Sequence, residues 1–380
     1  MDNNKIPLER VLIFRVGSMG DTVLAVPSFR LIARAFPIAE RCLLTYISGN
    51  QRATPLRSVL DGTGLIHSYL EYSEADRGLA GMSRLRRRIR AWKPDLMVYL
   101  MDPKGLAKIL RDAAFFRVAC GIPKVIGLPL SRDRRSWRVV DKDGNVEQVA
   151  ERLARSISEL GDPHLEDASS WDLQLSQVEH RTAATALSAL PPDQPLLAAS
   201  IGSKLDVNDW GDRNWASLLE SLSRKFPSWS LVMVGAQTEA ARTELLLKKW
   251  SGARLSLCGN TSVRVSAAVL SRAKLYVGHD SGPLHLAAAV GTPCVAIFSA
   301  RNPPGQWFPY GVRHRVLYHA VPCRGCALEV CIKKGKLCIA SITVPEVEAQ
   351  VMEQITLTQQ NGTELIPATL EIEQKGSIGG

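Results

Sequence analysis

The sequence predicts an α/β protein built from two doubly wound, Rossmann-like domains that face each other across a cleft. The chain has 380 residues, more than one hydrophobic core usually organises. Short β-branched, apolar runs alternate with segments of helical periodicity, which is typical of parallel sheets with right-handed helical crossovers. The breaker-rich segment Leu190–Pro195 interrupts this alternation, which then restarts, so we expect a domain linker there.

The first domain, 1–190, is expected to open with a strand over Arg10–Val16 and a helix over Thr22–Phe36. Further runs of strand composition in this half are Cys42–Ser48, Leu96–Met101 and Lys124–Leu128. The arginine-rich segment Arg84–Lys93 carries Leu85, Ile89 and Trp92 at helical spacing, which predicts a helix packed on the domain. Its arginines then form a solvated face, or meet anionic lipid headgroups or a phosphorylated glycolipid.

The second domain, 191–358, repeats the alternation. Its expected strands are Leu196–Ile201, Ser230–Gly235, Lys274–Gly278 and Cys294–Ser299, with helices between them. Glu346–Ile355 has the pattern of one more helix. A polar, glycine-ended tail, 359–380, follows.

Composition and charge limit the class of protein. Hydrophobic residues make up 46% of the chain, but no apolar run reaches the roughly 18 residues of a membrane span. The N-terminal segment is polar and lacks the apolar stretch of a signal peptide, so we expect a cytoplasmic protein. The net charge of +10 fits an anionic partner: a phosphate-bearing substrate, a membrane surface or nucleic acid.

The stretch YVGHDSGPLHLAAAVGTPCVAIFSA, Tyr276–Ala300, reads as strand, turn, helix and strand. Ser281 and Gly282 fall at the helix N-terminus, where backbone N–H groups and the helix dipole favour a phosphate or diphosphate. Asp280 repels phosphate and suits a sugar hydroxyl or a backbone N–H better. The alternative is that Asp280 or Ser281 merely caps the helix.

A second glycine turn, Val16–Asp21 (VGSMGD), follows the first strand. Ser18 and Gly20 lie in this tight loop and, with Arg15, are candidates for contact with the acceptor or a phosphate. Asp21 lies at the carboxyl end of the strand, where catalytic groups are commonly placed. Asp21 could equally be a carboxylate favoured by the helix dipole alone. Because no G-x-G-x-x-G follows the strand, a dinucleotide-dependent dehydrogenase is disfavoured.

Four of the eight cysteines cluster near the C-terminus: Cys323, Cys326, Cys331 and Cys338. Four thiolates at this spacing suit a structural zinc or iron ion, and nearby lysines and an arginine would offset their charge. The alternative is four reduced cysteines packed in a small subdomain. The remaining cysteines are expected to pack as small hydrophobes.

The two glycine turns carry a family resemblance. RVLIFRVGSMGDTVLAVPSFRLIARAFP, from Arg10, resembles the opening of the bacterial heptosyltransferases, glycosyltransferase family nine. YVGHDSGPLHLAAAVGTPCVAIFSARNPPGQWFPYG, from Tyr276, resembles the donor-site motif of that family, and GDRNWASLL and VGAQTEA resemble segments between. The resemblance covers most of residues 11–347, with the motifs in the same order as in the family. It is weak over residues 49–92.

The resemblance implies a GT-B fold with the acceptor on the N-terminal domain and the nucleotide-sugar donor on the C-terminal one. It implies inverting transfer of a heptose or related sugar, with ADP-heptose as the donor, to a lipopolysaccharide-core or other surface-glycan acceptor. No cofactor is then required for catalysis. A glycolipid acceptor would bring the enzyme into peripheral contact with the inner membrane.

The resemblance also implies roles for single residues. Asp21 matches the catalytic aspartate, and Ser281 and Gly282 match the diphosphate turn. Asp280 and His285 match the Asp and His of the donor motif, and Glu239 falls where the family's glutamate holds the nucleotide ribose.

The chain departs from the family pattern at several positions. Asn208 stands where well-known members have a phosphate-contacting lysine. Lys204 either reaches the same phosphate or is simply exposed. Arg15 resembles a basic residue near the family's active site, or it is a strand residue facing water. His279 replaces a usually apolar or small residue and receives no role.

Two other classes compete with the transferase. A noncatalytic relative could keep the nucleotide-sugar pocket and act as a scaffold. The departure at Asn208 favours this alternative, and the presence of Asp21 disfavours it. A zinc-containing nucleic-acid binder would explain the charge, the arginine run and the cysteines. Because the basic residues do not interleave with an aromatic stacking surface, no nucleic-acid partner is expected.

Overall fold

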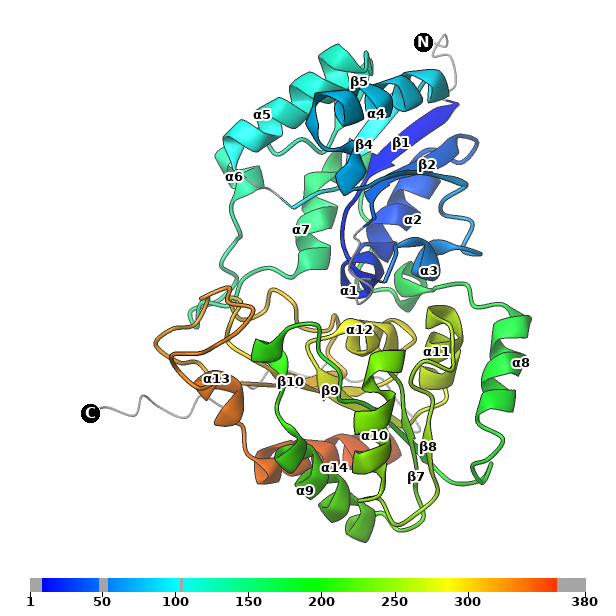
Figure 1. The fold of residues 1–380 in the computed structure, drawn as a ribbon, viewed down its shortest axis with the longest axis vertical. Coiled ribbons are helices and arrows are strands. Elements are labelled where there is room, and N and C mark those ends of the chain that lie inside the picture. Colours follow the sequence, from blue (N-terminus) through cyan, green and yellow to red (C-terminus); the bar gives the residue numbers. More distant parts are fainter. Residues whose placement is uncertain (1–8, 48–53, 103–104, 361–380) are drawn as a thin grey trace. The chain divides into compact units, whose positions relative to one another are not determined.

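The computed structural model describes residues 9–47, 54–102 and 105–360. The chain divides into two compact units, and each contains one parallel sheet with helices packed on it (Figure 1). Unit 1 comprises Met1–Val139 and Val149–Gln174, and unit 2 comprises Val140–Gln148 and Leu175–Gly380. The α/β class and the two doubly wound sheets are therefore confirmed. The expected tail lies outside the described residues, apart from its first two positions, which end a helix.

The sheet of unit 1 has the strand order β3-β2-β1-β4-β5, and every adjacent pair is parallel. Val11, Leu12 and Ile13 of the central strand are fully buried, as expected for a strand covered on both faces. The strands are β1 Arg10–Phe14, β2 Glu40–Tyr46, β3 Ser68–Tyr72, β4 Leu96–Tyr99 and β5 Lys124–Ile126.

The helix expected over 22–36 is in fact two helices, α1 and α2, separated by a short break. Pro27 lies in the first turn of α2, and a proline is tolerated there but not inside a helix because it lacks the N–H. The helices of unit 1 are α1 Met19–Val23, α2 Val26–Ala35, α3 Arg57–Leu60, α4 Gly78–Trp92, α5 Leu106–Ala114, the π-helix η2 Phe115–Ala119, α6 Arg132–Arg135 and α7 Val149–Ser156, with 3₁₀ turns η1 Glu74–Asp76, η3 Ser158–Leu160 and η4 Ala168–Trp171.

The arginine run lies on α4, and the expected packing is confirmed. Leu85 and Ile89 are buried against the sheet, and Trp92 packs against them half-buried. Three arginines of this helix are nevertheless not purely a solvated face. Their guanidinium groups donate hydrogen bonds to backbone carbonyls of neighbouring segments: Arg84 to Ala75, Arg86 to Ala119, and Arg88 to Glu71.

The sheet of unit 2 has the strand order β11-β10-β9-β6-β7-β8, again with all pairs parallel. The strands are β6 Leu196–Ser200, β7 Ser230–Met233, β8 Arg254–Ser256, β9 Leu275–His279, β10 Cys294–Phe298 and β11 His314–Tyr318. The four central strands were predicted, and the edge strands β8 and β11 were missed.

The helices of unit 2 pack with its strands in one core, in which Trp215 and Leu218 of α9 and Val351 of α14 are buried together. They are α8 Gln177–Ala186, α9 Asp212–Lys225, α10 Ala240–Leu247, α11 Val263–Leu270, α12 Gly282–Ala289, α13 Leu337–Ala340 and α14 Val344–Gln360, with 3₁₀ turns η5 Asp206–Asn208 and η6 Gln237–Glu239. Within the described part of the chain, no helix is both long enough and apolar enough to cross a bilayer.

Unit 2 begins earlier than the expected boundary at 190/191. Helix α8 packs against α11, and Arg264 of α11 forms an ion pair with Glu179 of α8. These contacts tie residues 175–190 to unit 2, so the proline-rich Leu190–Pro195 lies inside that unit. The assignment of acceptor and donor roles to the two domains stays a prediction.

Each sheet has one position where the chain order reverses. In unit 1 this switch lies between β1 and β4, and in unit 2 between β6 and β9. The loops that leave the carboxyl ends of the two strands diverge at such a position, and open α/β sheets bind their ligands there. Both glycine turns singled out in the sequence follow one of these strands: Val16–Asp21 follows β1, and Asp280–Gly282 follows β9.

Candidate active site

Asp21 lies in the first turn of α1 and folds back toward the end of β1. Its Oδ2 accepts hydrogen bonds from the backbone N–H and from the hydroxyl of Ser18, both at 2.8 Å. Gly17 makes this conformation possible, because a Cβ at that position would lie 2.4 Å from the Cβ of Asp21. The Asp21 side chain keeps 22% of its surface exposed, so it is fixed in place but still reachable. Gly20 is buried in the same turn.

Arg15 does not face water, because its side chain is fully buried. Its guanidinium donates to the backbone carbonyls of Leu100 and Asp21, at 3.2 and 3.1 Å. It also lies 3.9 Å from Oδ1 of Asp21 and 3.7 Å from Oδ2 of Asp102. A buried cation needs opposite charge nearby, and these two carboxylates provide it. Asp102, at the carboxyl end of β4, is therefore a site residue that the sequence reading missed.

In unit 2, Ser281 precedes α12 in an extended conformation but does not cap the helix with its side chain. Its hydroxyl donates to the carbonyl of His279 at 3.3 Å. Gly282 is the first residue of α12, and the first N–H groups of a helix have no intrahelical partner. The simple capping reading is thus wrong for the Ser281 side chain, and the turn retains the features of an anion site.

Asp280 is held by residues from several parts of unit 2. Its Oδ1 lies 3.9 Å from Nε2 of the buried His285, and Asn208 donates to its backbone and carboxylate oxygens at 3.4 Å. Asn208 is itself fixed by the Ser299 hydroxyl, which donates to the Asn208 amide oxygen at 2.5 Å. Asn208 therefore supports the predicted donor turn, a role that the sequence did not suggest.

Glu239 ends the turn η6 after β7, and two glycines leave room for its carboxylate. A Cβ on Gly202 would lie 1.9 Å from Oε1 of Glu239, and a Cβ on Gly235 would lie 2.3 Å from Oε2. Oε2 also accepts a hydrogen bond from the backbone N–H of Ala236 at 2.9 Å. Glu239 thus reaches the carboxyl ends of β6 and β7. Lys204 is exposed just after β6.

His279, to which the sequence reading gave no role, is a buried hydrogen-bond acceptor at the end of β9. Its Nε2 accepts from the backbone N–H of Trp210 at 3.2 Å and from the indole N–H of Trp215 at 3.1 Å. Burial lowers the pKa of His279 to about 4, so the ring is neutral at pH 7. This contact ties the start of α9 to β9, next to Asp280.

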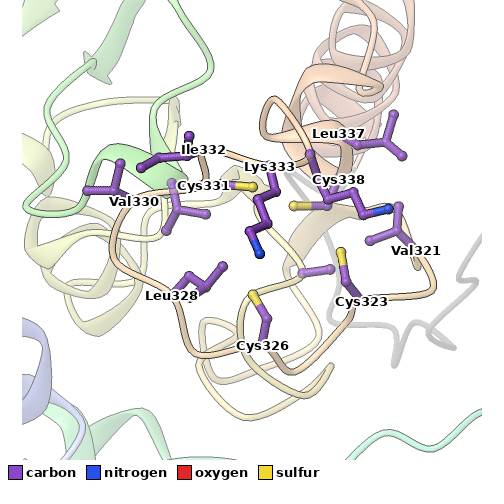
Figure 2. Close-up of a pocket in the computed structure, with 13 residues that line it drawn as sticks. Val321, Cys323, Cys326, Leu328, Val330, Cys331, Ile332, Lys333, Leu337 and Cys338 are labelled. Atoms are coloured by element: carbon purple, nitrogen blue, oxygen red, sulfur yellow. The ribbon is translucent and has the colours of Figure 1, made fainter.

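The four clustered cysteines line one cavity of about 270 Å³ in unit 2. Figure 2 shows their sulfur atoms turned toward a common space, into which Lys333 also points. All four thiols are free, and burial raises the pKa of Cys338. No three of their sulfur atoms lie within 4.8 Å of one another, whereas tetrahedral zinc at about 2.3 Å from each sulfur needs closer spacing. The donor set fits a metal, but the surrounding loop would have to contract around it.

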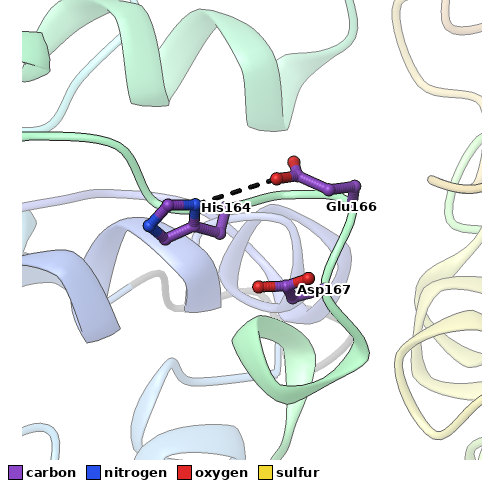
Figure 3. Close-up of side chains that lie close together, drawn as sticks. All are labelled: His164, Glu166 and Asp167. Carbon is purple, nitrogen blue, oxygen red and sulfur yellow. Dashed lines mark ion pairs between the residues drawn. The ribbon is translucent and has the colours of Figure 1, made fainter.

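A second group of potential ligands, His164, Glu166 and Asp167, lies on an exposed loop of unit 1 (Figure 3). Nδ1 of His164 is 3.7 Å from Oε1 of Glu166, an exposed ion pair. Exposed pairs of this kind contribute little free energy, and exposed acidic groups often lie together without a metal. We therefore assign this group no role.

Comparison with known proteins gives consistent results. The family model of glycosyltransferase family 9 (heptosyltransferase) matches residues 83–337. The curated lipopolysaccharide heptosyltransferase 1 of Pseudomonas aeruginosa is 25% identical over 342 residues, which cover 85% of this chain and 87% of the relative.

Two solved structures share the fold. The family 9 glycosyl transferase of Veillonella parvula superposes with a TM-score of 0.71 at 16% identity, covering 93% of this chain and 99% of the other. The Escherichia coli heptosyltransferase WaaC with ADP-2-deoxy-2-fluoro heptose superposes with a TM-score of 0.58 at 17% identity, covering 90% and 99%. The predicted GT-B fold is confirmed.

The buried His279 predicts how stability depends on pH. Its folded-state pKa of about 4 lies below the ordinary 6.5, so the unfolded chain binds a proton more readily, and stability falls as the pH drops from about 6.5 toward 4. By pH 5 the loss from this residue is about 2 kcal/mol. His314, whose pKa burial also lowers to about 4, acts in the same direction.

Urea unfolding of wild type and of His279→Gln at pH 7 and pH 5 measures this effect. The variant is expected to lose part of the pH dependence, since a glutamine can accept both N–H groups without titrating. His180→Gln, at an exposed position, is the matched control and should keep the wild-type slope. A full wild-type slope in His279→Gln would show that this ring does not titrate on unfolding.

Proposed function

Because the chain belongs to glycosyltransferase family 9, the heptosyltransferase family, we propose that it transfers a heptose or related sugar from a nucleotide-diphosphate donor, with ADP-heptose as the favoured donor. The acceptor is a hydroxyl of a lipopolysaccharide core or another surface glycan, and the transfer inverts the anomeric carbon. One observation carries this proposal: each unit presents acidic side chains at the switch point of its sheet, held by fixed hydrogen bonds.

We assign the donor to unit 2. The helix N-terminus at Gly282 and the Ser281 hydroxyl suit the diphosphate, while the carboxylate of Glu239 suits the two ribose hydroxyls. Asp280 is held by Asn208 and His285 and suits a hydroxyl of the donor sugar. Lys204, exposed after β6, is our candidate for the cation that contacts the phosphate.

We assign the general base to Asp21. Its Oδ2 already accepts two hydrogen bonds from Ser18, so Oδ1 is the oxygen that takes the proton from the acceptor hydroxyl. Arg15 lies beside Oδ1 and beside Asp102, and it fixes the direction of the carboxylate. Asp102, 34% exposed, can accept a hydrogen bond from the acceptor saccharide.

The reaction then runs in one displacement. The acceptor oxygen attacks the anomeric carbon from the face opposite the nucleotide while Asp21 takes its proton, and the bond from that carbon to the diphosphate oxygen breaks. The negative charge that develops on the leaving diphosphate is stabilised by the N–H groups of α12 and the Ser281 hydroxyl. These groups supply the charge stabilisation without a cofactor.

The cell compartment and partners follow from this chemistry. The enzyme works in the cytoplasm, where its nucleotide-sugar donor is made, and touches the inner membrane peripherally when its acceptor is a glycolipid. No nucleic acid is a partner. A chain that binds the nucleotide sugar but never transfers it would be the scaffold alternative, which the experiments below separate.

Substitution of the proposed general base tests the role of Asp21. In Asp21→Asn the side chain keeps its shape but cannot take the proton, so kcat is expected to fall by about 10²–10⁴-fold with unchanged donor affinity. Nucleotide release with ADP-heptose and a de-acylated core oligosaccharide measures this. Asp167→Asn, at an exposed position of the same unit, should retain wild-type kcat. Wild-type turnover in Asp21→Asn would remove Asp21 from catalysis.

A donor panel tests the site in unit 2. Calorimetric titration with ADP-heptose, ADP-, GDP- and UDP-hexoses and free ADP is expected to give the tightest binding for ADP-heptose. Asp280→Ala should weaken ADP-heptose but not ADP, because it faces the sugar. Glu239→Gln should weaken both by about tenfold, since it loses charge-assisted bonds to the ribose.

The matched control is Glu244→Gln on the exposed side of α10, which should bind like wild type. Binding of the whole panel with equal affinity, or no binding at all, would contradict the donor assignment. Tight donor binding without turnover in the wild type would favour the scaffold.

We further propose that Cys323, Cys326, Cys331 and Cys338 hold one structural zinc or iron ion. The four thiols face one cavity, which is the donor set that these metals prefer. A structure of the same fold, the heptosyltransferase TibC, is described as iron-containing; it superposes with a TM-score of 0.52 at 12% identity. The ion would tie the loop after β11 to α13.

Metal analysis of the purified protein tests this site. About one zinc or iron per chain is expected, and a chelator should lower the melting temperature because the bound metal stabilises the fold. Cys326→Ser should lose the metal, while Ile332→Ser, an exposed change in the same cavity wall, should keep it. A metal-free protein from cells supplied with both metals would contradict the proposal.

A further inference from the structure

An exposed apolar stripe runs along α5 and the π-helix η2 of unit 1. Leu106 and Leu110, one helical turn apart, are 44% and 51% exposed, and Val118 of η2 is 81% exposed. The same segment also holds the buried Ile109 and Phe116, which fix it to the unit. The segment is therefore firmly anchored while its outer side offers apolar side chains to the surroundings.

The same segment is positively charged. It carries Lys108, Arg111 and Arg117, all exposed, against the single carboxylate of Asp112. Asp112 already accepts hydrogen bonds from Tyr99 at 2.9 Å and from Arg111 at 2.7 Å. The exposed surface of the segment thus combines apolar side chains with a net positive charge.

Helix α4 extends the positive charge. The guanidinium of Arg86 donates to the carbonyl of Ala119, the last residue of η2, at 2.8 Å. Arg86 and Arg90 both lie close enough to the next residue, Cys120, to act on its thiol electrostatically. Two exposed arginines from a separate helix therefore stand beside the end of the stripe where Val118 projects.

We propose that this surface, formed by α5 and η2 and flanked by Arg86 and Arg90, docks on an anionic lipid bilayer. A helix that lies in a membrane interface inserts a narrow apolar side among the acyl chains while basic residues meet acidic headgroups. The surface offers both kinds of side chain, apolar and basic. A nucleic acid would use the cations but leave the apolar stripe in water, and so fits less well.

The position of the surface gives it a use. Helix α5 begins shortly after Asp102, at the carboxyl end of β4. Docking would hold the carboxyl edge of this sheet near the bilayer, where a lipid-linked acceptor is anchored. This use rests on the proposed function, but the docking itself does not, because it needs neither donor nor acceptor.

Vesicle co-sedimentation of the full chain tests the proposal. The wild type is expected to bind phosphatidylcholine vesicles containing about one third phosphatidylglycerol at low salt, and to bind pure phosphatidylcholine at least tenfold more weakly. The double variant Leu110→Glu/Val118→Glu should lose at least tenfold in vesicle affinity. Lys108→Gln/Arg117→Gln, which leaves the apolar side chains in place, should weaken binding to anionic vesicles only.

The matched control is Leu245→Glu, a change at a 65% exposed leucine of α10 in unit 2, which should bind vesicles like the wild type. Circular dichroism and transfer to a soluble acceptor should be unchanged in all these variants, since none of the residues belongs to the proposed site. The proposal would be overturned if Leu110→Glu/Val118→Glu bound anionic vesicles like the wild type. An equal loss of vesicle affinity in Leu245→Glu would also overturn it. So would a wild-type protein that binds RNA but not vesicles. Loss of transfer alone, with vesicle binding intact, would count against the proposed function and not against the docking.

Discussion

A glycine at the end of a strand lets an acidic side chain fold back over the edge of the sheet, and the candidate site depends on this close approach in both units. Gly17 makes room for Asp21 after β1, and Gly202 and Gly235 make room for Glu239 after β6 and β7. A Cβ would lie 2.4 Å from the Cβ of Asp21 at Gly17, and 1.9 and 2.3 Å from the Glu239 carboxylate at Gly202 and Gly235, so any larger residue would displace the acidic side chain. A carboxylate held in this way needs little reorganisation when a hydroxyl group reaches it.

Buried polar contacts then keep the strand ends in place. Arg15 lies under the first turn, between Asp21 and Asp102, and a guanidinium buried there keeps both carboxylates oriented. In unit 2, the neutral ring of His279 accepts two N–H groups from the start of α9, and Asn208 links Ser299 to Asp280. A buried polar group that loses its hydrogen-bond partner lowers the stability of the fold. Each hydrogen bond in these networks is therefore kept, and it restricts the geometry of the site. The proposed chemistry uses the outer groups, and these inner groups position them.

The sequence predicted the central strands well because each is a largely buried apolar run. It missed β3, β8 and β11, which lie at sheet edges and have mixed polar composition. Asp21 and Ser281 were found because a strand, a glycine turn and a helix are adjacent in sequence. Asp102 and Asn208 were not found, because their partners lie far away in the sequence. Asn208 contacts Asp280 across 72 positions of the chain. Arg15 contacts Leu100, two residues before Asp102, across 85 positions. Only the sheet order brings such residues together. The break before α2 was readable from Pro27, which suits the first turn of a helix better than its interior.

The most direct test of this account is a crystal structure of the protein grown with ADP. We expect diphosphate oxygens about 3 Å from the N–H of Gly282 and the hydroxyl of Ser281, with both ribose hydroxyls on the carboxylate of Glu239. We also expect Gly202→Ala to displace Glu239 and leave the ribose without that contact, while the diphosphate stays in place. A nucleotide bound at another edge of the sheet, or a ribose that never touches Glu239, would contradict it.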